Sequence, residues 1–439
     1  MKKETKAKNK PSFANKSEAQ FVKGLMVVKI KQDVVRGMPL LKETPSRTVR
    51  SMKLPSAVGD PLESMMAEHL IEGIVPVFPS QAAAHTLRTV RSATAAIAAS
   101  VQEQKEPELR GINLIQIKKD SDAKKLQKSM EKLPGVLYCD PVPARWLTAK
   151  TGNNSKKLWN LDAIFWYDIP KGCRNAGKIR VGVIDSGFDA THPAFENCVH
   201  DYHYDRSLTS KRDILGHGTH VAGIIAAALG ENGMSGMCTC NLHLWKVFLD
   251  EPDDNGEYYV DELMYLRALN ETRTTGCRII NLSLGGAVLD RAEEDVVRLL
   301  VRNGITIVAA MGNEYNYGNP TEYPAAFKDV IAVGATNDLG ERADFSNTGK
   351  HINLSAPGVD IVSTLPVRKS SARDEIRYGA WSGTSMATPH VTAAVAMILA
   401  KHRSLTPNQI VNRLKKATTL KGSTRVEVGA GLLNLKNAI

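Results

Sequence analysis

Beyond residue 150, short runs of β-branched and aliphatic residues alternate with longer amphipathic stretches. Strands are predicted at residues 178–184, 242–248, 278–283, 305–310 and 330–333, and helices at residues 218–228, 261–271, 291–302 and 385–402. Strands that alternate with helices are joined by crossover connections and predict a parallel sheet. The expected fold class of residues 151–439 is therefore α/β, a doubly wound, mostly parallel sheet with helices on both faces. Ligands of such sheets bind at the carboxyl ends of the strands.

Before residue 150 the pattern differs and predicts a second, smaller domain. Strands are expected at residues 21–31, 111–118 and 135–139, and a helix is expected at residues 120–133. Prolines between residues 39 and 79 interrupt regular structure, and the alanine-rich residues 81–104 fit a helix. We therefore expect a flexible basic arm at residues 1–20, and an α+β domain at residues 21–150 with a long insertion at about residues 33–108.

The net charge of +11 comes from the N-terminal third of the chain. Residues 1–150 hold 26 basic and 15 acidic residues, whereas residues 151–439 hold 31 of each. A solvated basic tail explains this excess, and an electrostatic tether to an acidic partner is the alternative. Nucleic-acid binding is not expected, because the segment lacks the aromatic platforms on which bases stack.

Cysteine usage and hydropathy bear on the compartment. Six cysteines in 439 residues are too few for a disulfide-stapled domain, so free thiols are expected. Cys238, Cys240 and His243 lack a second ligand pair for a metal. No run of 18 apolar residues predicts a membrane helix, and no apolar region marks a secretory signal. The cytoplasm is the expected location, with leaderless export left open.

Three segments carry candidate catalytic side chains at points where a strand leads into a turn or helix. Asp185 ends the strand VGVID, His217 lies between two glycines before an alanine-rich helix, and Ser385 follows a Gly-Thr turn at the start of a long apolar helix. In the order Asp, His, Ser they match one known arrangement of a catalytic triad.

Each of these residues also has a structural interpretation. A strand-end aspartate can cap a helix or bind a metal, and a serine at a helix start is a common N-cap. His217 and His220 are three residues apart, but the sequence lacks the metalloprotease signature and a third ligand. We expect His220 to be a packed helix residue.

Several long motifs together resemble the subtilisin family of serine peptidases. They are VGVIDSGFDATHPAF, GHGTHVAGIIAA, NLSLGG, AAMGNE, VIAVGA, SAPGVDI and SGTSMATPHVTAAVA, and they extend over about residues 155–439. The resemblance implies that Asp185 orients the histidine, His217 is the general base and Ser385 is the nucleophile. It implies a cofactor-free endopeptidase that cleaves polypeptides through an acyl-enzyme.

The resemblance also implies residues that bind the substrate. Asn313 and the backbone N–H of Ser385 would stabilise the oxyanion, as such donors do in acyl transfer. Substrate-binding roles fall on an edge formed by Ser283, Leu284 and Gly285, and on a primary pocket lined by Gly312 and Glu322. A carboxylate at position 322 would favour Lys or Arg at P1, unless Glu322 points to the surface.

Two further loops lie at positions where the family binds substrate or calcium. The acidic residues 250–257 are either solvated or select basic residues at distal subsites. Residues 229–241, where the family often has a calcium loop, are short and contain one carboxylate, whereas calcium takes six to eight oxygen ligands. No metal site is therefore expected.

Residues 109–145 resemble the second half of a subtilisin-type propeptide. That resemblance implies an intramolecular inhibitor and a zymogen that cleaves itself in the linker between about Arg145 and Ser155, with Lys150 as the preferred P1 residue. A transpeptidase on the same fold is the nearest rival. The other is a catalytically silent binding module.

Overall fold

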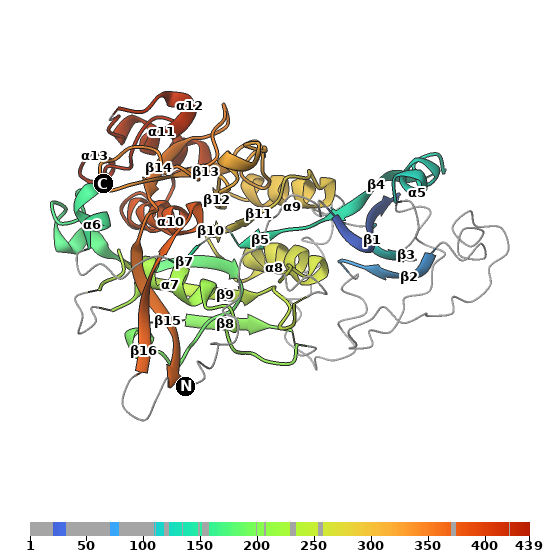
Figure 1. Cartoon of the computed structure of the whole chain (residues 1–439), viewed down its shortest axis with the longest axis horizontal. Coiled ribbons are helices and arrows are strands. Elements are labelled where there is room, and N and C mark those ends of the chain that lie inside the picture. Colours follow the sequence, from blue (N-terminus) through green and yellow to red (C-terminus); the bar gives the residue numbers. More distant parts are fainter. Residues whose placement is uncertain are drawn as a thin grey trace, which may run out of the picture.

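The structure is a computed structural model, shown as a whole in Figure 1. It describes residues 21–31, 71–78, 109, 111–117, 123–133, 135–147, 150–151, 158–198, 200–205, 208–228, 234–252, 258–369, 375–420 and 422–439. The arm expected at residues 1–20 and the alanine-rich helix expected at residues 81–104 lie outside the described residues.

A seven-stranded parallel sheet forms the centre of the C-terminal part, and the predicted α/β class is confirmed. In spatial order its strands are β14 (Leu354–Pro357), β13 (Ile331–Thr336), β12 (Thr306–Ala310), β10 (Ile279–Leu282), β7 (Asn175–Asp185), β9 (Thr239–Lys246) and β8 (His200–Tyr204). On one side of β7 the sheet continues with β9 and β8, and on the other side it continues with β10, β12, β13 and β14. The switch point between the halves therefore lies at β7 and β10, where doubly wound sheets bind their ligands.

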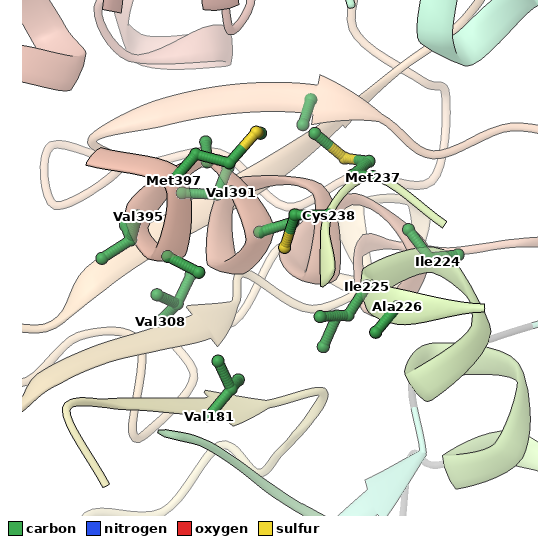
Figure 2. Close-up of a cluster of buried hydrophobic side chains, with 14 of the residues drawn as sticks. Val181, Ile224, Ile225, Ala226, Met237, Cys238, Val308, Val391, Val395 and Met397 are labelled. Carbon is green, nitrogen blue, oxygen red and sulfur yellow. The ribbon is translucent and has the colours of Figure 1, made fainter. Parts of the chain in front are cut away.

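Helices cover both faces of this sheet. One face carries α7 (His217–Ala226) and α10 (Thr384–Lys401), and the other carries α8 (Glu262–Thr274) and α9 (Arg291–Arg302). Helix α10 is buried along nearly its whole length, because its residues are apolar on all sides. Figure 2 shows Val391 and Val395 of α10 gathered with Val308 and Val181 of the sheet.

The remaining elements surround this core. They are α6 (Trp159–Ala163), α11 (Pro407–Ala417), α12 (Arg425–Val428), α13 (Leu435–Ala438), β15 (Ile361–Lys369), β16 (Glu375–Ser382), and the short 3-10 helices Lys171–Arg174, Pro193–Phe195 and Tyr315–Tyr317. Strands β15 and β16 pair antiparallel, and β16 leads into α10. None of the described helices combines the length and the hydropathy that a bilayer span requires.

The N-terminal part forms a separate antiparallel sheet beside α8 and α9, at the right of Figure 1. Its order is β2 (Ile71–Pro76), β3 (Ile112–Ile117), β1 (Phe21–Ile30) and β4 (Val136–Pro143), with α5 (Ala123–Met130) packed on β4. Strand β2 falls within the expected insertion and was missed. Its six residues end in proline, and only their pairing with β3 identifies them as a strand.

Apolar and charged contacts join this sheet to α9. Val27 and Tyr138 share a hydrophobic cluster with residues of α8 and α9. Lys29 Nζ lies 2.5 Å from Asp295 Oδ2, and Arg291 Nε donates to Asp140 Oδ2 at 2.7 Å. The two parts of the chain therefore form one packed body.

Candidate active site

Asp185 and His217 form a buried hydrogen-bonded pair at the carboxyl end of the sheet. Asp185 is the last residue of β7, and His217 is the first residue of α7. The His217 Nδ1 atom lies 2.7 Å from Asp185 Oδ1, which also accepts from the Ser186 amide at 2.7 Å. A carboxylate on Nδ1 fixes the proton there and leaves Nε2 as the acceptor in neutral histidine.

Glycines allow α7 to start this close to β7. A Cβ atom at Gly218 would lie 2.1 Å from the carbonyl oxygen of Gly187. Gly216, the N-cap, has a φ of +82°, a backbone conformation that disfavours other residues. The Gly-His-Gly motif is thus required by a close backbone approach that places His217 beside Asp185.

Asp213 and Ser186 hold the start of α7, and sequence reasoning missed both. The carboxylate of Asp213 accepts from the amides of Gly216 and Thr219, each at 2.8 Å. The Ser186 hydroxyl donates to Asp213 at 2.8 Å and accepts from the Gly218 amide at 3.0 Å. An aspartate three residues before the glycine is a helix-start signal that could have identified the first of these.

Ser385 lies in the first turn of α10, next to the substrate edge predicted at residues 283–285. Its Oγ donates to the Ser283 carbonyl oxygen at 2.8 Å. The His217 ring centroid lies 6.0 Å from that of Trp381, four residues before Ser385. His217 Nε2 is buried and has no hydrogen-bond partner among the described residues. The structure therefore joins Asp185 to His217, while the Ser385 hydroxyl bonds to the neighbouring backbone.

A buried polar network fixes the backbone of Ser385. The Ser283 hydroxyl donates to the Ser385 carbonyl oxygen at 2.9 Å and accepts from Asn281 Nδ2 at 2.9 Å. Thr392 on α10 donates to Asn281 Oδ1 at 2.8 Å. Each of these buried polar groups has a hydrogen-bond partner, so the network holds α10 in one position against β10.

Asn313 follows β12 and faces the start of α10. Its Oδ1 accepts from the Thr384 amide at 2.9 Å and from the Thr384 hydroxyl at 3.0 Å. These bonds orient the planar side chain with its oxygen toward Thr384 and its NH₂ group away from it. An amide donor and a helix N-terminus, whose backbone dipoles favour negative charge, thus lie side by side.

Glu322 lies inside the protein, between Gly312, which was expected to line the primary pocket, and Gly285 of the expected substrate edge. It is 4% exposed, so it does not point to the surface. A Cβ atom at Gly312 would lie 2.4 Å from Glu322 Oε1, and one at Gly285 would lie 2.9 Å from Oε2. Asn347 Nδ2 donates to Glu322 Oε1 at 3.3 Å. The carboxylate therefore takes up the space left by the two glycines.

The chain's own linker pairs with two strands near Ser385. Strand β5 (Trp146–Leu147) pairs antiparallel with β11 (Leu284–Gly285), and β6 (Lys150–Thr151) pairs antiparallel with Trp381 and Ser382 of β16. The paired segments belong to the expected cleavage region. Two short extended segments of the linker, β5 and β6, therefore pair with strands on either side of the serine.

The three other histidines described next have surroundings that differ from those of His217. His220 stacks on Trp381 with ring centroids 5.0 Å apart, and burial lowers its pKa to about 3, so it is a packed neutral residue.

Of the ligand-type side chains in the described ranges, Asp201, His203 and His243 come together in an arrangement that could hold a metal. His203 Nε2 and His243 Nδ1 lie 3.4 Å and 3.8 Å from Asp201 Oδ2.

The structure describes part of the acidic loop and all six cysteines. Asp250 contacts Lys246, Thr209 and Ser210, so it is a buried structural residue, while residues 253–257 lie outside the described ranges. All six cysteines are free thiols, as expected.

The parallel α/β fold and this site define a serine peptidase. The profile of the subtilase family matches residues 176–432, more than half of the sequence, and the chain belongs to that family.

Two subtilisins illustrate the similarity. Subtilisin from Bacillus pumilus is 37% identical over 263 residues, which are 60% of this chain and 90% of that protein. Subtilisin E from Bacillus subtilis (strain 168) is also 37% identical over 263 residues, and the match spans 65% of its length.

Two solved structures are also similar. The protease domain of PatA, solved as a mutant, superposes with a TM-score of 0.52 at 29% identity, over 61% of this chain and 96% of that one. Fervidolysin from Fervidobacterium pennivorans, described as a keratinolytic enzyme related to subtilisin, has a TM-score of 0.68 over 96% of this chain and 61% of its own. At 21% identity this second likeness shows the fold alone.

Proposed function

We propose that the protein is a serine endopeptidase made as a zymogen, with Asp185, His217 and Ser385 as its catalytic triad. The 2.7 Å bond between Asp185 and His217 Nδ1, with Ser385 at the start of α10, is the observation that carries this proposal. For its proton to pass to His217 Nε2, the Ser385 hydroxyl must leave the Ser283 carbonyl oxygen. Such a hydrogen bond often forms only when substrate is bound.

The chemistry follows from these positions. Ser385 Oγ attacks the substrate carbonyl carbon while its proton passes to His217 Nε2, and Asp185 stabilises the imidazolium. Asn313 Nδ2 and the Ser385 amide donate to the oxyanion. His217 then gives the proton to the leaving amine, the acyl-enzyme remains, and a water molecule hydrolyses it by the same steps in reverse.

The N-terminal part acts as an inhibitor whose tail occupies the substrate edges. Leu147 pairs with Leu284 on one side of the serine, and Lys150 pairs with Ser382 on the other. The register supports self-cleavage at a bond between Leu147 and Lys150. Since Lys150 pairs with β16, on the other side of the serine from β5, it would follow the cleaved bond, which departs from the expectation that Lys150 is P1. A preference for Lys or Arg at P1 through Glu322 would then apply to other substrates.

Intact mass of the purified wild type and the Ser385→Ala variant tests the triad and the self-cleavage together. We expect two fragments from the wild type, with the larger one beginning between residues 148 and 150, and an unprocessed variant. A wild type that stays full length, or equal processing of both proteins, would contradict the proposal. Gly172→Ala, at an open surface position, is the matched control and is expected to process normally.

A further inference from the structure

Arg145 is a fully buried cation that belongs to the N-terminal part but is held by the peptidase. The residue is 2% exposed. Its Nη1 bonds to Glu262, and its Nη2 lies 2.9 Å from Glu293 Oε2 and 3.4 Å from Asp290 Oδ2. The guanidinium carbon also lies 4.8 Å from the centre of the Tyr265 ring. One guanidinium thus contacts three carboxylates and an aromatic face.

The three carboxylates come from the starts of two peptidase helices. Glu262 is the first residue of α8, Asp290 is the N-cap of α9, and Glu293 lies in the first turn of α9. Helix N-termini favour negative charge, which helps to explain how these carboxylates gather in one place. Asp290 also caps α9 by accepting from the Ala292 amide at 2.8 Å, and Glu293 Oε1 accepts from the Tyr265 hydroxyl at 2.5 Å.

Arg145 reaches this pocket as part of an extended segment on the substrate edge. Trp146 pairs with Gly285, so the preceding residue lies opposite Gly286. A Cβ atom at Gly286 would lie 2.4 Å from the Ala144 carbonyl oxygen, which confirms the close approach of the two backbones there. The pocket is therefore continuous with the edge along which a substrate would lie.

Among the described residues, Arg145 is the one cation paired with this pocket. In the described part of the chain, the ion pairs of Glu262, Asp290 and Glu293 are all with Arg145. Burial raises the pKa of Glu262 and Glu293, and Arg145 acts in the opposite direction. Removing one partner of such a buried cluster is strongly unfavourable, because the other charges stay uncompensated. Loss of the N-terminal part would leave a pocket that requires a cation.

The other charged contacts between the N-terminal part and the peptidase differ from that of Arg145 in their exposure and location. Lys29 and Arg291 join the antiparallel sheet to α9 at partly exposed positions. Arg145 alone among these cations precedes a strand that pairs with the substrate edge. Its environment is that of a bound substrate side chain rather than of a contact between two domains.

We propose that Glu262, Asp290 and Glu293 form a binding pocket for an arginine side chain of the polypeptide substrate, at the position opposite Gly286, and that Arg145 occupies it in the zymogen. This inference rests on the proposed peptidase activity and adds a substrate class to it: chains that carry arginine upstream of the cleaved bond. The planar guanidinium matches several carboxylates at once, which a lysine ammonium does not.

Peptides with the chain's own sequence over residues 141–154 test the pocket directly. The processed wild type should cleave the arginine peptide with a kcat/KM about 10- to 100-fold above that of peptides with alanine or citrulline at position 145, as expected for loss of a charged hydrogen bond. A lysine peptide should fall between them. This comparison needs no variant of the enzyme and does not depend on how variants fold.

Variants of the pocket assign the effect to its residues. Glu262→Gln and Glu293→Gln should reduce the preference for arginine over citrulline to a few-fold. Glu294→Gln, at a half-exposed neighbouring position of α9, should keep both the full preference and the wild-type cleavage of the citrulline peptide. Equal cleavage of all four peptides by the wild type, still abolished in Ser385→Ala, would overturn the pocket alone. Absence of any cleavage that depends on Ser385 would overturn the proposed function instead.

Discussion

At the scale of single residues, the site contains two kinds of side chain. Sequence motifs identify some of them, whereas the role of the others depends on their surroundings in the folded protein. Asp185, His217 and Ser385 are in motifs, whereas Glu262 and Glu293 look like ordinary charges at helix starts. Burial separates the two groups, because a carboxylate in the interior needs a cation and a carboxylate at the surface does not.

Glu322 carries the residue-scale prediction. Because its carboxylate lies between Gly285 and Gly312, Glu322→Gln should lower the ratio of kcat/KM for Lys or Arg over Leu at P1 by about 10-fold or more, through loss of a charge-assisted contact. A P1 peptide library with the processed enzyme measures this ratio. Glu294→Gln is the control, and an unchanged P1 profile in Glu322→Gln would remove Glu322 from substrate recognition.

At the scale of elements, catalysis depends on how closely helices begin beside the strand ends. Strand β7 and helix α7 approach until only glycine fits at position 218, and the network of Asn281, Ser283 and Thr392 holds α10 on β10. These contacts position two side chains from distant parts of the chain with little freedom, which is the form of preorganisation that acyl transfer needs.

Gly218→Ala tests this close approach. The added methyl would lie 2.1 Å from the Gly187 carbonyl oxygen, so α7 must shift and move His217 away from Asp185. We expect self-processing and peptide cleavage to fall at least about 100-fold, as misplacement of a catalytic group by about 1 Å does. The melting temperature should also fall. Gly172→Ala, with no atom within 4 Å of its Cβ position, should change neither, and an active Gly218→Ala enzyme would show that the approach is not required.

At the scale of the whole molecule, hydrophobic clusters on the two faces of the sheet support the site, and His220 and His390 are fully buried. Burial lowers the pKa of His220 to about 3 and that of His390 to about 4. The unfolded chain binds protons at these residues from about pH 6.5 downward, whereas the folded chain does not. Their contribution to stability is therefore complete above pH 6.5 and is lost as the pH falls toward 4 and 3.

Urea unfolding of the Ser385→Ala chain at pH 7.5, 6.5 and 5.5 measures this loss without self-digestion. Below pH 6.5 the free energy of unfolding should fall by about 1 kcal/mol per pH unit for each of the two histidines. His220→Asn should reduce that slope, and His402→Asn, at an exposed position, should leave it unchanged. A stability that does not vary over this range would show that these histidines are not neutral in the folded chain.

The agreement between sequence and structure was best for several strands and helices of the central α/β part. Helix α9 has the predicted bounds, and β7, β10, β12 and α10 begin or end within a few residues of their predicted bounds. Strands β2 and β8 were missed, because six or five residues carry little periodic signal and their neighbours in space decide their conformation. The longer elements β15, β16 and α11 were also not predicted.

The sequence by itself determined the alternation of strands and helices, the family, and the positions of the acid, imidazole and hydroxyl, because these depend on local periodicity and on motifs. Only the tertiary structure decided that Arg145 is buried among Glu262, Asp290 and Glu293, that Glu322 lies between two glycines, and that the linker pairs with both edges beside Ser385. The physical reason is that burial and charge pairing join residues that are far apart in the chain. A local sequence pattern does not identify the distant residue that buries or pairs with a given side chain.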